Sequence, residues 1–177
     1  MRKNTYNLVV TAMLLALGMV LPFLTGQLPA IGQAISPLHI PALICGLLCG
    51  APWGLALGAV LPLLRSVIFG MPPLVPVGIP MAFELATYGA VCGLLYPRLI
   101  RLGKNHLSAM LISLIVAMVL GRIAGGAVKA VVMGLTGGTY SFSAFVAAYF
   151  TTTLPGAVIH LILVPAIVTA AERIKRA

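Results

Sequence analysis

The sequence predicts an all-α integral membrane protein, a bundle of six transmembrane helices with both termini in the cytoplasm. Of its 177 residues, 61% are hydrophobic and only 7% are charged, whereas soluble domains carry about 25% charged residues. The apolar residues form long runs, and the basic residues that give the net charge of +9 gather in short clusters between them. This distribution excludes a soluble enzyme and a nucleic-acid-binding module.

The apolar stretches are long enough to cross a bilayer, and they are separated by breaks rich in Pro and Gly. They span residues 7–24, 38–70, 78–97, 107–133 and 144–171. The second stretch poses a problem, because a crossing needs only about 20 residues. It contains Gly50-Ala51-Pro52-Trp53-Gly54, a run typical of a turn. We therefore expect two shortened helices here, and we expect Pro97 to end the fourth helix.

The positions of the basic clusters determine the predicted membrane topology of the chain. Basic clusters mark cytoplasmic segments, and this chain has three, namely Arg2/Lys3, Arg98/Arg101/Lys104 and Arg173/Lys175/Arg176. An even number of crossings must then separate consecutive clusters, so the second stretch counts as two helices. We expect one transmembrane domain over residues 1–177, with helices at 7–24, 38–50, 54–70, 78–97, 107–133 and 144–171. The loops 25–37, 71–77 and 134–143 carry no charge and are expected outside.

Several polar side chains fall inside apolar segments, where a charge costs about 2.5–3.5 kcal/mol. The predicted threading places most of them in the outer half of the membrane. We therefore predict a polar substrate-binding pocket open to the outside, formed by His39, Glu84, Arg122, Arg65, Tyr88, Lys129 and His160. The alternative is structural, with a salt bridge between Arg65 and Glu84 and with Lys129 reaching the membrane surface.

No catalytic or metal-binding constellation is present in the sequence. There is no aspartate, and the only acidic side chains are Glu84 and Glu172, which argues against two-carboxylate hydrolysis and carboxylate-rich metal cages. The sequence also lacks a phosphate-binding loop, an HExxH motif and a Gly-x-Ser-x-Gly motif. We expect no catalytic residue, no metal site and no enzyme, so a pocket in this chain indicates binding or transport.

Three short segments carry a family resemblance that extends over essentially the whole length. The first is the pair Ala12 and Ala16 at four-residue spacing. The second runs from His39-Ile40-Pro41-Ala42 through Gly50-Ala51-Pro52-Trp53-Gly54, and the third is Met81-Ala82-Phe83-Glu84-Leu85-Ala86-Thr87-Tyr88-Gly89. Together they resemble the substrate-binding S component of energy-coupling factor (ECF) vitamin transporters.

The resemblance implies partners and a mechanism. Ala12 and Ala16 would contact a transmembrane T subunit, which couples to two cytoplasmic ATPase subunits. ATP would be used by those partners, with no cofactor in this chain. The S component would topple in the bilayer of the bacterial cytoplasmic (inner) membrane and carry its ligand inward. No nucleic acid is expected as a partner.

The ligand implied by the resemblance is a small water-soluble vitamin or precursor. Similarity around His39 and Glu84 favours hydroxymethylpyrimidine or pyridoxine. The excess of cations over carboxylates favours instead an anionic vitamin such as pantothenate, niacin or folate. A stand-alone membrane channel or scaffold subunit remains a different functional class.

Overall fold

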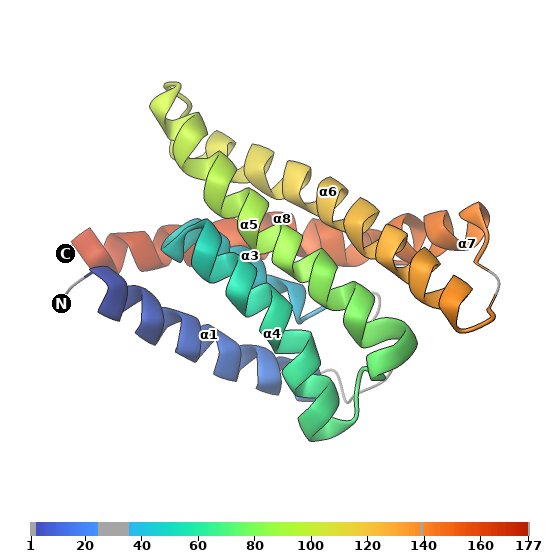
Figure 1. Ribbon diagram of the computed structural model, residues 1–177. Coiled ribbons are helices and arrows are strands. Elements are labelled where there is room, and N and C mark those ends of the chain that lie inside the picture. Colours follow the sequence, from blue (N-terminus) through green and yellow to red (C-terminus); the bar gives the residue numbers. More distant parts are fainter. Residues whose placement is uncertain (1–2, 25–35, 139, 177) are drawn as a thin grey trace.

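The computed structural model describes residues 3–24, 36–138 and 140–176, and this part of the chain is helical without strands (Figure 1). The helices are α1 (Lys3–Leu24), α3 (His39–Cys49), α4 (Ala51–Phe69), α5 (Ile79–Arg101), α6 (His106–Leu135), α7 (Phe142–Val146) and α8 (Leu154–Arg176). A wider helical turn spans Ala147–Thr151, and Leu74–Gly78 form a kinked segment in which the backbone of Val75 is extended. Among the described residues, five segments are long and apolar enough to cross a membrane, and α3 is a shorter apolar helix. The predicted class, an all-helical multi-pass membrane protein, is confirmed at this level.

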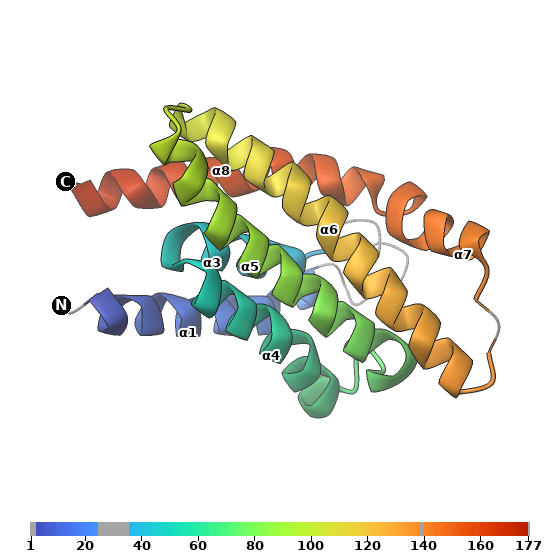
Figure 2. The same cartoon turned by 45° about the horizontal axis from the view of Figure 1, so that its top comes forward.

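The long helices lie lengthwise beside one another, with α1 on one side of the bundle and α6 and α8 on the other (Figures 1 and 2). Both chain ends, the turn at Gly50 and the turn between α5 and α6 lie toward one end in both views. The connections that follow α4 and α6 lie toward the other end. Most of the loop predicted at 25–37, together with Arg2, falls outside the described residues.

The second apolar stretch is broken between α3 and α4, but the break is narrower than the 50–54 turn that the sequence suggests. Gly50 alone separates the helices, with a φ of +91° that only glycine adopts readily. Pro52 and Trp53 belong to the first turn of α4. Proline is tolerated there because the first turn of a helix has no intrahelical acceptor for its missing N–H.

The prediction that Pro97 ends the fourth helix is wrong. Helix α5 continues to Arg101, and the amide of Leu102 still donates to the carbonyl of Arg98 at 3.1 Å. Pro97 removes one backbone donor, but its position near the helix end is exposed. Helix α5 continues for only four residues beyond Pro97, so the interruption falls in the last turns of the helix, where proline costs less than in the interior.

The last apolar stretch is expected as one helix over 144–171, but the structure divides it. α7 ends at Val146, a wide turn spans Ala147–Thr151, and α8 begins at Leu154. Pro155 follows directly and has no N–H to continue the hydrogen-bond ladder backward, so a new helix begins at this point.

Glycines bring α3, α4 and α5 into close contact around the core. A Cβ on Gly54 would lie 2.7 Å from the Cα of Gly46, and one on Gly46 would lie 3.0 Å from the Cα of Gly89. Leu85 and Cys92, on the same helix as Gly89, are fully buried. Helix α5 is therefore the central element of the bundle, and it also carries the polar residues described next.

Candidate functional site

Glu84 is the buried centre of a polar cluster on α5. Its carboxylate accepts a hydrogen bond from the Tyr88 hydroxyl at 2.6 Å, and the His39 Nε2 lies 3.4 Å away. Glu84 and Tyr88 are one helical turn apart, so their side chains share a face. Both contacts involve the same oxygen, Oε1, and among the described residues Oε2 takes part in no hydrogen bond. Oε2 is thus the acceptor that remains available.

His39 is the first residue of α3 and connects that helix to Glu84. Its Nδ1 lies 3.0 Å from the carbonyl oxygen of Ser36, which can only accept, so Nδ1 carries a proton. The contact of Nε2 with the Glu84 Oε1 links α3 to α5 and gives the carboxylate a polar neighbour, which lowers the cost of placing it inside a membrane.

His160 brings α8 to the same cluster. Its side chain is buried, and its ring stacks on the His39 ring with centroids 5.7 Å apart and an interplanar angle of 25°. The Tyr88 ring lies 5.2 Å from the His39 ring on another side. Helices α3, α5 and α8 therefore meet at His39. The described residues contain no group of three or more His, Cys, Asp or Glu side chains that could hold a metal ion.

Two glycines on α6 make room for this cluster. A Cβ on Gly125 would lie 2.9 Å from the Glu84 Cβ and 3.3 Å from its Oε2, and one on Gly121 would overlap the Tyr88 ring. Helix α6 therefore approaches α5 closely at Gly121 and Gly125. Any larger side chain at Gly125 would displace Glu84.

Arg122 lies between those glycines and extends the cluster toward α8. It is buried, it donates to the Thr153 carbonyl oxygen at 3.5 Å, and its guanidinium lies 5.7 Å from the Phe150 ring centroid. It also interacts electrostatically with the Tyr88 hydroxyl. The described residues give Arg122 no ion pair with a carboxylate.

Lys129 lies two turns further along α6, between aromatic rings. Its Nζ is 5.6 Å from the Tyr140 ring centroid and 5.8 Å from that of Tyr149, distances at which a cation is attracted to a ring face. Within the described residues the Tyr140 hydroxyl has no hydrogen-bond partner, and burial raises its pKa. That hydroxyl is therefore a neutral donor at physiological pH.

Arg65 is the one predicted site residue that the structure separates from the others. Its buried guanidinium lies between the rings of Phe23 and Phe69, 5.1 and 5.2 Å from their centroids, and it donates to the Met19 carbonyl oxygen. The salt bridge with Glu84 that the sequence allows does not form. Arg65 instead joins the ends of α1 and α4, so two cations rather than three accompany the Glu84 cluster.

The sequence reasoning missed the aromatic residues that face these cations. Tyr140, Tyr149 and Phe150 come from the segment between α6 and α8, and Tyr149 is close enough to Glu84 to interact with it electrostatically. A signal was present, because residues 140–150 include five aromatic side chains in a chain that is only 7% aromatic.

Comparison with known protein families identifies the family of this chain. A family model of the substrate-specific component of ECF transporters matches residues 6–168. No curated protein and no solved structure matches the chain. The match covers nearly all of the helices described above and agrees with the resemblance found in the sequence. The chain therefore belongs to the substrate-specific components of ECF transporters, as a substrate-binding rather than a catalytic membrane subunit.

Proposed function

We propose that this subunit captures a small water-soluble vitamin or vitamin precursor with high affinity and delivers it to an ATP-driven uptake transporter in a bacterial cytoplasmic membrane. The observation that carries the proposal is the buried Glu84–His39–Tyr88 cluster, where α3, α5 and α8 meet. Placing polar groups inside a membrane costs free energy, and such groups therefore indicate a functional site such as a binding pocket. The family match disfavours the alternative of a stand-alone channel or scaffold.

The proposed ligand is a small heteroaromatic molecule with hydroxyl or amino donors, such as hydroxymethylpyrimidine or pyridoxine. The Glu84 Oε2 supplies an acceptor for such donors, and the rings of His160, Tyr149 and Phe150 supply faces on which a planar ring can stack. A hydrogen bond to a charged group contributes about 1.5–3 kcal/mol. One such bond together with ring stacking supports selective capture.

A second ligand class is favoured by one specific observation. Arg122 is buried without a carboxylate partner among the described residues, and an anionic vitamin such as pantothenate, niacin or folate would provide one. The position of Arg65 weakens this alternative, since its guanidinium is already engaged by Phe23, Phe69 and Met19.

We expect the membrane orientation to follow the basic clusters, with both termini and the turn between α5 and α6 in the cytoplasm. Single cysteines at Pro73 and Gly138 should then react with an impermeant maleimide in intact cells, while one at Asn105 should not. The native residues Cys45, Cys49 and Cys92 are buried and give little background. A third outer site, Gly32, falls outside the described residues. Labelling of Asn105 from outside would overturn the proposed orientation.

We propose that Ala12 and Ala16 form the contact with the transmembrane T subunit, which two cytoplasmic ATPases drive. Both alanines are exposed on α1, among larger exposed side chains such as Met13 and Leu17. Small residues at four-residue spacing let another helix approach closely. The double variant Ala12→Trp/Ala16→Trp should abolish co-purification with the T subunit and reduce uptake at least tenfold.

A matched control uses an exposed pair at the same spacing on another helix. Ile115 and Val119 are exposed on α6, and Ile115→Trp/Val119→Trp should leave assembly with the T subunit intact. Both double variants should retain the ligand that the isolated wild-type chain carries, because neither pair touches the Glu84 cluster. Normal uptake by Ala12→Trp/Ala16→Trp would show that α1 does not form the coupling surface.

A further inference from the structure

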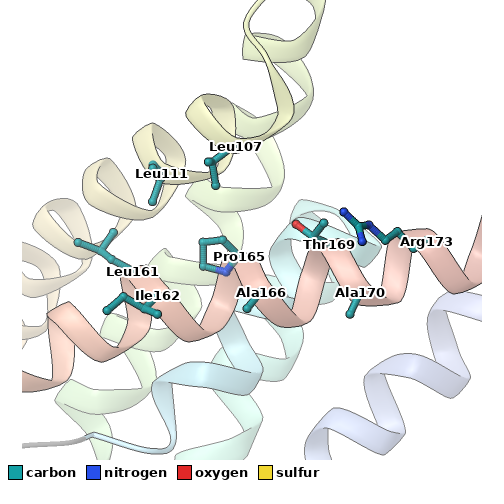
Figure 3. A pocket seen from close by; sticks show the side chains of 9 residues that line it. All are labelled: Leu107, Leu111, Leu161, Ile162, Pro165, Ala166, Thr169, Ala170 and Arg173. Carbon is teal, nitrogen blue, oxygen red and sulfur yellow. The ribbon is translucent and has the colours of Figure 1, made fainter.

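An apolar groove of about 510 Å³ lies between α6 and α8, toward the end of the bundle that holds both termini (Figure 3). Leu107 and Leu111 line it from the first turns of α6. Leu161, Pro165, Thr169 and Arg173 line it from α8. None of these residues belongs to the Glu84 cluster, and the proposed substrate capture does not use them.

The groove exists because the hairpin of α5 and α6 diverges from α8 at this end (Figures 1 and 2). Polar side chains join the diverging helices. The Tyr96 hydroxyl donates to Glu172 at 3.2 Å, and the His106 Nδ1 lies 3.9 Å from the same carboxylate. Val164 and Val168 on α8 are fully buried, which leaves Pro165 and Thr169 facing the groove. The opening is therefore fixed by contacts on both sides.

The apolar and charged parts of the groove lining follow one another in the same order as the acyl chain and headgroup of a lipid. Its apolar part extends from Leu161 toward Thr169, and Arg173 supplies a cation at the terminal end (Figure 3). From residue 161 to 173 the helix rises roughly 18 Å, close to the ~15 Å of one leaflet's hydrocarbon layer. Thr169 lies about 6 Å before Arg173 along the axis, which is the order of ester and phosphate in a glycerophospholipid.

The charges around the terminal end favour an anionic headgroup. Arg173 is exposed and lines the groove, whereas Arg101 and Lys104 in the neighbouring turn are exposed but do not line it. The one carboxylate nearby, Glu172, is engaged by Tyr96 and His106. Basic pockets between transmembrane helices are known to bind anionic headgroups.

We propose that the groove between α6 and α8 binds an anionic phospholipid of the adjacent leaflet. One acyl chain lies along Leu107, Leu111, Leu161 and Pro165, and the phosphate contacts Arg173. Such a lipid fills the space between the α5–α6 hairpin and α8, and it covers apolar surface that helix packing leaves open.

Native mass spectrometry of the detergent-purified full chain tests this proposal, with phosphatidylglycerol and phosphatidylcholine of identical acyl chains as probes. The wild type should retain phosphatidylglycerol at least fivefold better than phosphatidylcholine. Arg173→Gln should remove that preference, because it removes the cation without changing the apolar lining. Ala166→Trp, which adds bulk to the α8 side of the groove, should reduce retention of both lipids. Arg101→Gln is the matched control and should behave as the wild type does.

Equal retention of the two lipids by the wild type would overturn the proposal, and so would an unchanged preference in Arg173→Gln. The variant Ala166→Trp distinguishes a lipid site from a protein interface. If this variant retained both lipids as the wild type does but no longer co-purified with the partner membrane subunit, the groove would be a protein interface instead. The measurement does not involve the transported ligand, so its failure would leave the proposed function untouched.

Discussion

Replacing Gly89 with alanine should destabilise the protein by about 3 kcal/mol, although alanine is ordinarily the better helix residue by about 1 kcal/mol. A Cβ at Gly89 would lie 2.7 Å from the Cα of Gly54 and closer still to the Gly54 carbonyl group. The obstacle is backbone, which cannot rotate away as a side chain can. Helices α4 and α5 would have to separate, and the core around Leu85 and Cys92 would lose its packing.

Gly134 provides the matched control for this prediction. It is also a glycine within a helix, α6, but nothing lies within 4 Å of a Cβ added there. Gly134→Ala should leave the melting temperature unchanged or raise it slightly. Thermal unfolding of the three detergent-purified proteins, followed by circular dichroism, measures the difference. Equal melting temperatures for Gly89→Ala and Gly134→Ala would contradict the close contact between α4 and α5.

Glu84→Gln should reduce affinity for a heteroaromatic ligand by about 5- to 150-fold, which corresponds to 1–3 kcal/mol for a hydrogen-bonding group left unpaired. The amide keeps the shape of the side chain but removes the negative charge next to His39 and one of the two acceptor oxygens. Tyr88→Phe should have a smaller effect, because it removes a donor to Oε1 and leaves Oε2 available. Isothermal titration with hydroxymethylpyrimidine and pyridoxine measures these affinities.

Arg122→Gln separates the two proposed ligand classes. If the ligand is anionic, binding of pantothenate or niacin should depend mainly on Arg122, and Glu84→Gln should have the weaker effect. Glu172→Gln is the control for Glu84→Gln, since it makes the same substitution at a carboxylate that contacts Tyr96 near the end of α5 and His106 at the start of α6. If neither Glu84→Gln nor Arg122→Gln alters binding of a ligand that the wild type retains, the cluster is structural.

Hydropathy and charge were sufficient to predict the class of fold, because backbone polar groups cannot be left unpaired in lipid and apolar segments that cross it must therefore be helical. The Glu84–Tyr88 contact could also be expected, since residues four apart on a helix share a face. The four-residue spacing of Gly121 and Gly125 is typical of close approach between membrane helices. Their neighbours, Glu84 and Tyr88, were not evident from the pattern.

Features that depend on how helices rotate about their axes could not be predicted. The contact of Arg65 with Phe23 and Phe69 is one case, because hydropathy gives the depth of a residue in the membrane and not the direction in which it points. The aromatic residues Tyr149 and Phe150 are another, because the sequence shows that aromatic residues are concentrated at 140–150 but not toward which helix each ring points. The prediction that Pro97 ends a helix was wrong because a proline near a helix end costs less free energy than one in the helix interior.

The central claim, that this chain is a substrate-binding subunit whose ligand contacts Glu84, is tested most directly by mass spectrometry of small molecules released from the purified protein. The wild type should release one small vitamin-like compound in near-stoichiometric amount, and Glu84→Gln purified in parallel should release at least fivefold less. Glu172→Gln should match the wild type. Release of the same compound in equal amounts from the wild type and Glu84→Gln would contradict the assignment of the site.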